Sequence, residues 1–283
     1  MPPIFHFDLQ ALSRSQGRNS VAAAAYRAGV LLHDPRLGKG FDYRRRHGVV
    51  HAQIITPTYV GAIDRQTLWA AVEAAENRKN SVVAREIILA LPCEISEAAQ
   101  IKLVHRFGVF LRDRYEVPVD CVIHSPSRGG DQRNDHAHVL FPTRHLLPDG
   151  TFGEKTRELD VKSSSAIEVK KMRAVWETMV NESLASEGIA ARVDCRSHTA
   201  RAEERGGLVL PAQKHLGPSA AAAKRRGQRP RAERVNDEIL HATSLLIETN
   251  RELKQELAVQ PLQASKSRRP PVPRAAHRYG PKP

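Results

Sequence analysis

Two short apolar segments, Val119–His124 and His136–Phe141, flank a polar loop of Ser, Gly, Asp, Arg and Asn residues. Each segment has the length and apolar character of a β-strand. The loop between them carries no helix pattern, which favours an antiparallel arrangement of neighbouring strands.

The rest of the chain adds further strand and helix patterns. Strands are predicted over residues 4–9, 48–55 and 84–91, and helices over residues 21–28, 67–78, 97–114, 166–187 and 232–259. We expect Ser20 to cap the first helix and Gly29 to end it. These elements predict an α+β fold, with a central, mostly antiparallel sheet flanked by helices and a basic helical C-terminal extension.

Charge is distributed unevenly along the 283 residues. The chain has 44 Lys and Arg against 31 Asp and Glu, a formal net charge of +13. Residues 1–195 carry 26 basic and 23 acidic side chains, whereas residues 196–283 carry 18 and 8. A pI near 10 is typical of proteins that bind a polyanion such as nucleic acid. We expect a domain over residues 1–230, a helix over 231–260 and a disordered, basic, Pro-rich tail over 261–283.

Composition also excludes several classes of protein. Hydrophobic residues make up 41% of the chain, which is enough for a folded core. The three cysteines, Cys93, Cys121 and Cys195, are odd in number and lack ligand spacing, so neither a disulfide framework nor a cysteine zinc site is supported. No membrane-span pattern and no signal-peptide pattern is present. We therefore expect a protein of a reducing compartment without membrane insertion.

Histidine is the most informative residue type. His136 and His138 alternate within a strand pattern, which places both on one face, roughly 7 Å apart. His124 ends the preceding strand and completes a three-histidine cluster if the two strands pair as neighbours. Three neutral imidazoles leave positions open for water or substrate, as in catalytic metal sites. The alternative is a chance pair, because the chain contains 13 histidines.

Tyr26 and Glu86 differ from their neighbours in character. Tyr26 lies among alanines, which leave the phenol accessible to a polymer backbone. A tyrosine can be the nucleophile of phosphoryl transfer when a metal or base is near, although an ordinary half-buried helix tyrosine is the alternative. Glu86 interrupts an apolar strand, so it is either a salt-bridge partner or an acidic group near the metal face.

Several short motifs follow one another between about residues 4 and 230. They are Ser13-Arg14-Ser15-Gln16-Gly17-Arg18, Tyr26 within residues 20–29, Asp42-Tyr43, Gly48-Val49-Val50-His51, Ala84-Arg85-Glu86-Ile87, His124, Asn134-Asp135-His136-Ala137-His138, Arg192-Val193-Asp194-Cys195-Arg196-Ser197 and His215-Leu216-Gly217-Pro218. In this order they resemble the MobA/MobL family of plasmid mobilization relaxases.

The resemblance implies an HUH-type endonuclease, a class named after its His-hydrophobe-His pair, with an antiparallel sheet as the floor of the active site. It implies that Tyr26 attacks one phosphodiester at a plasmid transfer origin, which leaves a free 3′-OH and a 5′-phosphotyrosine link. The implied metal ligands are His124, His136 and His138. Mg²⁺ or Mn²⁺ is the expected metal, and imidazole ligands alone favour the softer Mn²⁺ or Zn²⁺.

Glu86 falls on the strand that brings an acidic residue to the site in the family. A second acid, which relatives often carry two positions later, is replaced here by Ile88. Three roles for Glu86 therefore stay open: a general base, a metal-site residue or a structural residue.

The partner that the resemblance implies is single-stranded or melted DNA in the cytoplasm of a bacterium that carries a plasmid or other mobile element. Candidate backbone contacts are Arg27, Arg44, Arg45, Arg46, Arg128 and Arg133. The run from Arg44 to Arg46 could equally be a solvated turn. Accessory relaxosome proteins and a type IV secretion coupling protein are further implied partners.

Two other functions stay open at this point. A rolling-circle replication initiator shares the chemistry, but such initiators usually place the tyrosine after the histidine pair, and Tyr26 precedes it. In a non-catalytic basic DNA-binding accessory protein, Tyr26 and the histidines would be packing residues and the basic extension would bind the DNA.

Overall fold

The computed structural model describes residues 3–129, 131–197, 200–201, 214, 220, 223–224 and 226–264. Contacts divide the chain into two units, residues 1–195 and residues 196–283. The strands and the three histidines predicted to form a cluster, His124, His136 and His138, belong to the first unit.

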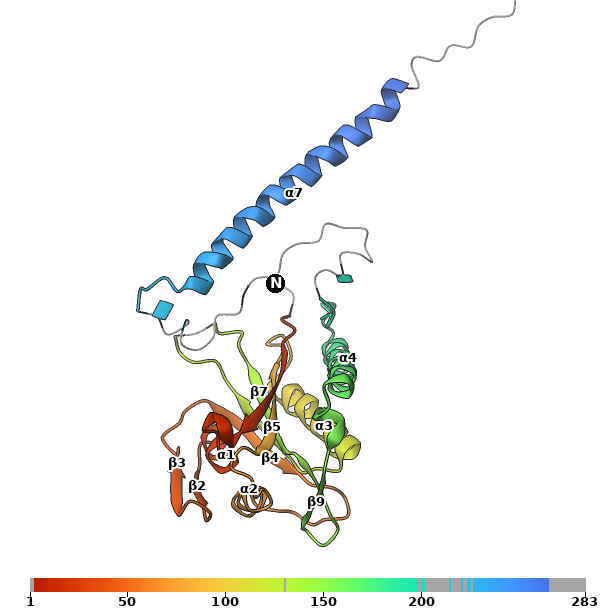
Figure 1. Ribbon diagram of the computed structural model, residues 1–283. Helices are drawn as coiled ribbons and strands as arrows, with labels where there is room; N and C mark the ends of the chain where they lie inside the picture. Colours follow the sequence, from red (N-terminus) through yellow and green to blue (C-terminus); the bar gives the residue numbers. More distant parts are fainter. Residues whose placement is uncertain are drawn as a thin grey trace, which may run out of the picture. The chain divides into compact units, whose positions relative to one another are not determined.

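Five strands form one sheet in the first unit, and each neighbouring pair is antiparallel (Figure 1). In spatial order they are β1 (Phe7–Ser13), β5 (Val82–Ala90), β7 (His136–Pro142), β6 (Val119–His124) and β4 (Val49–Ile55). The predicted α+β class and antiparallel sheet are confirmed.

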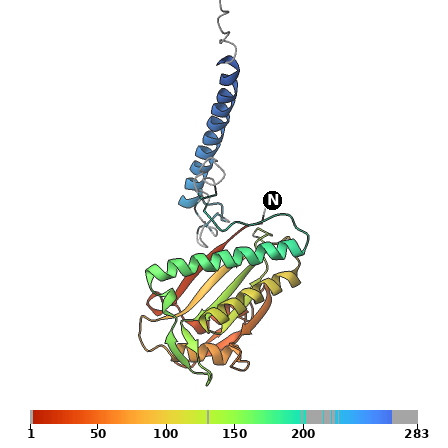
Figure 2. The same cartoon turned by 90° about the vertical axis from the view of Figure 1, so that its right-hand side faces the viewer.

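Helices α3 (Glu97–Tyr115) and α4 (Lys162–Ser186) lie side by side over one face of the sheet (Figure 2). Alternate residues of the strands point into this layer, where Ile87 and Val139 are fully buried with Phe107. Apolar burial on this side contributes the larger of the two cores.

The opposite face carries α1 (Ser20–Ala28) and α2 (Arg65–Ala74) (Figure 1). Their apolar residues pack against Leu12 and Leu140, which the two-residue period of the strands directs to this side. Two small hairpins complete the unit, β2 (Leu31–Asp34) with β3 (Lys39–Asp42) and β8 (Arg144–Leu146) with β9 (Phe152–Lys155), together with 3₁₀ turns at Arg14–Gln16 and Arg157–Leu159.

The start of α1 differs from the sequence prediction. Asn19, not Ser20, is the N-cap, and its side chain accepts a hydrogen bond from the Ala22 N–H at 2.8 Å. Ser20 is instead bound to the buried Glu73, whose Oε1 accepts from the Ser20 N–H at 2.7 Å and from its hydroxyl at 2.9 Å. The predicted helix end at Gly29 is confirmed, with φ of 66°.

Other boundaries moved by a few residues. The helix predicted over residues 67–78 occupies Arg65–Ala74, because Asp64 caps it through the Thr67 N–H. The helix predicted over residues 166–187 begins at Lys162. The sequence indicated only turns between the first helix and residue 48, whereas this segment contains the β2–β3 hairpin.

The second unit contains α7 (Arg231–Ala264). The domain boundary at residue 230 stays a prediction. The tail predicted over residues 261–283 begins too early, because residues 261–264 belong to α7. Residues 265–283 and the motif at residues 215–218 lie outside the described residues. Across the helices of the described ranges, none is long and apolar enough to cross a membrane.

Candidate functional site

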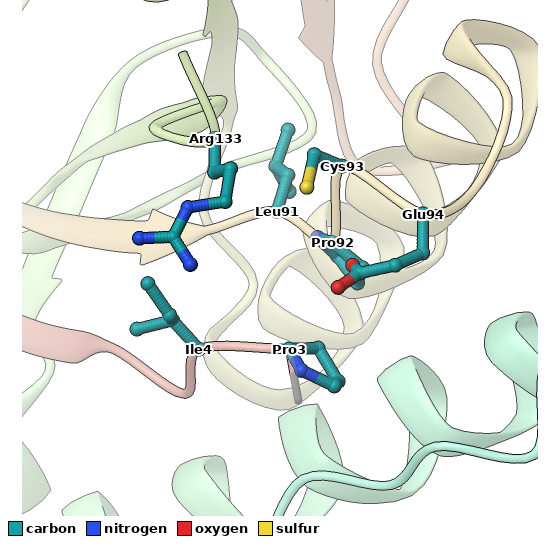
Figure 3. A pocket seen from close by; sticks show the side chains of 7 residues that line it. All are labelled: Pro3, Ile4, Leu91, Pro92, Cys93, Glu94 and Arg133. Atoms are coloured by element: carbon teal, nitrogen blue, oxygen red, sulfur yellow. The ribbon is translucent and has the colours of Figure 1, made fainter. Parts of the chain in front are cut away.

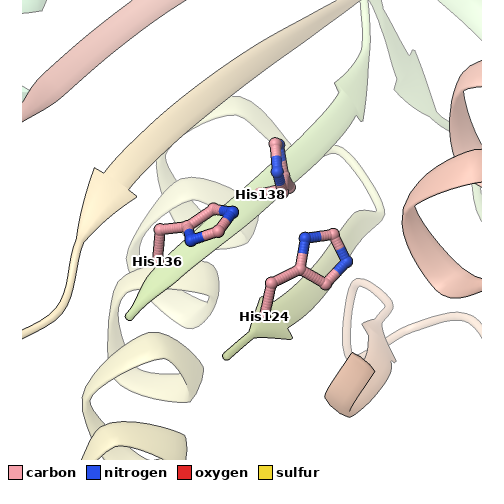
Figure 4. A group of neighbouring side chains, drawn as sticks. All are labelled: His124, His136 and His138. Carbon is pink, nitrogen blue, oxygen red and sulfur yellow. The ribbon is translucent and has the colours of Figure 1, made fainter. Parts of the chain in front are cut away.

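Three histidines meet at the ends of β6 and β7 (Figure 4). The register pairs His124 with His136 and Val122 with His138, which brings all three rings to one face of the sheet. Their ring centroids lie 4.9–5.3 Å apart, and one nitrogen from each ring lies within 4.8 Å of the others. The three nitrogens are therefore close enough together to bind one metal ion.

Hydrogen bonds fix the orientation of each ring. The Nδ1–H of His138 donates to the Glu86 carboxylate at 2.6 Å, and the Nδ1–H of His136 donates to the Asn134 carbonyl at 2.8 Å. The Nε2–H of His124 donates to the Arg27 carbonyl at 2.7 Å. These bonds leave Nε2 of His136 and His138 and Nδ1 of His124 as the atoms that could bind a metal ion. Such hydrogen-bond partners on the other ring nitrogen are typical of metal-binding histidines.

Burial lowers the pKa of two of the three histidines. Burial is the main cause that lowers the pKa of His124 to about 4, and it also lowers the pKa of His136. Both rings are therefore neutral near pH 7, the form that binds a metal. Burial opposes the charge of Glu86, but hydrogen bonds from His138 and Arg27 outweigh it and lower the Glu86 pKa to about 2.

Tyr26 lies in the last turn of α1, on the same side of the sheet as the histidines. Ala24 and Ala25 lie on the buried face of α1, and their small side chains let the helix approach the sheet closely. The Tyr26 side chain is 45% exposed. The Tyr43 ring meets it edge-on at 5.2 Å, and the Arg46 guanidinium lies 3.9 Å from the centroid of its ring.

Arg27, the next residue, joins the nucleophile candidate to the histidines in two ways. Its carbonyl accepts from His124, as described above, and its guanidinium forms a two-pronged ion pair with Glu86. Glu86 in turn holds His138. The structure thus links Tyr26, Glu86 and the histidines, which the sequence separates by up to 112 positions.

An open cleft of about 760 Å³ borders the cluster. It is lined by Arg46, His47, Gly48, His124, Ser125, Pro126, Ser127, Arg128, Asn134 and His136. Two of the predicted DNA-binding arginines, Arg46 and Arg128, therefore share the cleft with two of the histidines.

Of the other predicted arginines, Arg27 pairs with Glu86 beside the histidines, and the remaining three do not line the cleft. Arg44 is exposed and paired with Asp42 at 2.7 Å, and Arg45 is exposed. Arg133 is paired with Asp131 at 2.6 Å and borders a small pocket beside Ile4 and Leu91 (Figure 3). That pocket does not include the histidines.

Three groups of the site were not assigned a role from the sequence. Tyr43 contacts the Tyr26 ring, and the carbonyls of Arg27 and Asn134 orient two histidines. Backbone carbonyls leave no signal in a sequence. The position of Tyr43 depends on the β2–β3 hairpin, which could not be predicted from the turn residues alone.

The antiparallel sheet presents a histidine cluster, and an exposed tyrosine lies on a neighbouring helix. This is the HUH-type arrangement that the sequence led us to expect. Comparison with known proteins agrees. The MobA/MobL family model matches residues 18–226, and the chain belongs to this family.

Relatives of known name support the assignment. Mobilization protein MobL of Acidithiobacillus ferridurans is 36% identical over 248 residues, which cover 79% of this chain and 64% of that protein. Conjugal transfer protein TraA of Rhizobium radiobacter is 30% identical over 265 residues, which cover 82% of this chain but only 23% of that protein. The chain thus spans less than two thirds of the length of either relative.

A solved structure from a study titled "Molecular Basis of Vancomycin Resistance Transfer in Staphylococcus aureus" has a similar fold. Its TM-score is 0.61 and its sequence identity 29%, and the match covers 69% of this chain and 99% of that chain.

Proposed function

We propose that this chain is a DNA relaxase that nicks and rejoins one strand at a plasmid transfer origin and so initiates conjugative mobilization. The observation that carries the proposal is the connection between an exposed tyrosine and a partly buried three-histidine cluster through Arg27 and Glu86. Membership of a family with mobilization and conjugal transfer proteins supports it.

Tyr26 is the nucleophile in this proposal. Its phenol oxygen forms a bond to the scissile phosphorus while the bond from phosphorus to the 3′ oxygen breaks. The phenol proton leaves the tyrosine, and a proton is taken up by the released 3′ oxygen. The phosphodiester is exchanged for a phosphotyrosine ester, so rejoining needs no nucleotide cofactor.

The three histidines fit a divalent metal ion, because their rings are held in place by hydrogen bonds and lie close enough together for one ion, and burial keeps His124 and His136 neutral. His124 Nδ1, His136 Nε2 and His138 Nε2 would hold it, and we propose Mn²⁺ or Mg²⁺. When bound, such an ion polarises the phosphate and offsets charge in the transition state. Glu86 serves the site by holding His138 and Arg27 in place.

Single-stranded or melted DNA is the proposed substrate, because the reaction requires one strand to reach Tyr26 and the histidines that line the cleft. Arg46 and Arg128 are placed in the cleft to contact its phosphates. Arg45 is exposed next to Arg46 in the sequence, and Arg27, Arg44 and Arg133 also carry the charge for backbone contacts. We place this reaction in the bacterial cytoplasm, with relaxosome proteins and a type IV coupling protein as partners.

Covalent capture of DNA tests the proposal. The protein is incubated with Mn²⁺ or Mg²⁺ and a plasmid that carries the transfer origin of its own mobile element, and the reaction is stopped with SDS. We expect a nicked circle with the protein attached to the 5′ end. Tyr26→Phe should form no adduct.

Tyr59 provides a matched control, because it is 46% exposed and its hydroxyl donates to the Leu146 carbonyl, outside the site. Tyr59→Phe should retain the adduct. Nicking that persists in Tyr26→Phe contradicts the assignment of the nucleophile. Binding of the DNA without nicking by the unaltered protein favours the accessory DNA-binding alternative.

A further inference from the structure

Arg46 differs from three other arginines near the site. Arg27, Arg44 and Arg133 each pair with a carboxylate. Within the described ranges, no carboxylate lies within ion-pair distance of Arg46, and its Nε is buried without a hydrogen-bond partner. Its guanidinium therefore keeps donors for another anion.

The position of this guanidinium is defined by two contacts. Its carbon lies 3.9 Å from the centroid of the Tyr26 ring, which is close for a cation–π contact. Its Nη2 lies 3.4 Å from Nδ1 of His124, the nitrogen that the other hydrogen bonds of the cluster leave for a metal. One side chain thus touches both the nucleophile and a ligand.

A single turn holds this side chain in place. The Arg46 N–H donates to the Tyr43 carbonyl at 2.9 Å, and the Tyr43 N–H donates to the Val30 carbonyl at 3.2 Å. The Tyr43 ring packs edge-on against Tyr26 from the same turn. Two side chains of residues 43–46 therefore confine the Tyr26 ring, one over its face and one at its edge.

We propose that Arg46 is a positioning residue, which holds the Tyr26 ring beside His124 and supplies fixed positive charge where the phosphate enters. The proposal rests on the proposed function. A planar guanidinium suits both tasks, because it stacks on a ring and still directs N–H groups at phosphate oxygens. Lysine offers the charge without the plane.

This placement has opposite consequences for metal binding and for reaction. A positive charge next to His124 Nδ1 repels an incoming dication, so its removal should strengthen metal binding. Replacing Arg46 also frees the Tyr26 ring and should slow the attack of Tyr26 on the phosphate. A residue with a purely structural role would weaken both.

Two measurements on Arg46→Gln and Arg46→Lys test this. Mn²⁺ alone is titrated into each protein by calorimetry, and adduct formation is followed in a single turnover at saturating DNA. For Arg46→Gln we expect Mn²⁺ affinity to rise by about threefold, since one nearby charge is lost, and the adduct rate to fall by about tenfold. Arg46→Lys should keep the Mn²⁺ affinity of the unaltered protein and recover only part of the rate.

Lys39→Gln serves as the control, because it removes one positive charge from the β2–β3 hairpin away from Tyr26. It should change neither quantity. An unchanged adduct rate in Arg46→Gln, or weaker Mn²⁺ binding with a lower melting temperature, overturns the proposal. If the unaltered protein forms no adduct, the proposed function fails. The Mn²⁺ titration still tests Arg46 in that case. If Arg46→Gln does not bind Mn²⁺ more tightly than the unaltered protein, the proposed effect of Arg46 on His124 is wrong.

Discussion

The Nε2 of His124 lies 2.7 Å from the carbonyl oxygen of Arg27, the residue that follows Tyr26. The last carbonyls of a helix have no partner within the helix, and this hydrogen bond satisfies one of them. The same bond sets the orientation of the His124 ring. The end of α1 and the histidine cluster therefore depend on each other.

We expect His124→Ala and His136→Ala to differ in stability although both lose metal binding. His124→Ala also removes the bond to α1 and should lower the free energy of unfolding by about 1–3 kcal/mol. Among the described residues, the His136 ring hydrogen-bonds to the nearby Asn134 carbonyl alone. The free energy of unfolding of His136→Ala should therefore stay close to that of the unaltered protein. Denaturant unfolding and Mn²⁺ titration measure the two effects.

Single-strand DNA binding provides the second readout for this pair. His136→Ala should bind a single strand within a few-fold of the unaltered protein, because phosphate contacts carry most of the affinity. Equal loss of DNA binding and metal binding would mean that the histidines are structural.

Glu86→Gln should weaken Mn²⁺ binding by about 10- to 100-fold, because the carboxylate orients His138. It should also cost roughly 3 kcal/mol of stability, because Arg27 loses its buried ionic partner. Calorimetric titration and urea unfolding report the two quantities.

Glu76→Gln is the matched comparison for this change. Glu76 is also buried and pairs with Arg144 and Lys155, away from the histidines. Its replacement should destabilise the fold and leave Mn²⁺ affinity unchanged. Similar metal affinities in the two variants would count against a role of Glu86 at the cluster.

Gly29→Ala should destabilise the protein more than Gly38→Ala. Both glycines have positive φ, 66° and 59°, a conformation that costs an alanine roughly 1 kcal/mol. A Cβ at Gly29 would also lie 3.3 Å from the Val49 side chain, whereas nothing lies within 4 Å of one at Gly38. Thermal unfolding of both variants gives the comparison, and equal melting temperatures would show that the Val49 contact relaxes without cost.

Gly108→Ala places a methyl group in the packed layer between α3 and the sheet. Its Cβ would lie 2.5 Å from Cδ1 of Ile55 and 2.9 Å from the Cys121 sulfur. We expect a loss of about 1–3 kcal/mol from overpacking. Ile55→Val removes that Cδ1, so the double variant should be more stable than the sum of the single changes predicts. Strict additivity in urea unfolding would contradict this explanation.

Local sequence patterns were enough to predict the features of the fold that depend on residues close together in the sequence. The alternation of His136 and His138 and the position of His124 at a strand end led to the cluster before any pairing was known. Gly29 marked the end of α1, because its backbone takes the left-handed conformation that glycine favours.

Other features depend on groups that are distant in sequence. Ser20 has a good capping side chain, yet the buried Glu73, 53 positions away, binds it and leaves the cap to Asn19. The pairing of Arg27 with Glu86 bridges 59 positions and could not be read from either neighbourhood. Tyr43 reaches Tyr26 only through the β2–β3 hairpin.

The bond between Arg27 and His124 also bears on what happens when the molecule opens locally. Fraying of the last turn of α1 would carry the phenol away and release the His124 ring in the same event. A partly open molecule therefore keeps neither a poised nucleophile nor an intact set of ligands. We therefore expect the site to assemble as one unit, so that under the proposed function a partly unfolded molecule would not cut DNA.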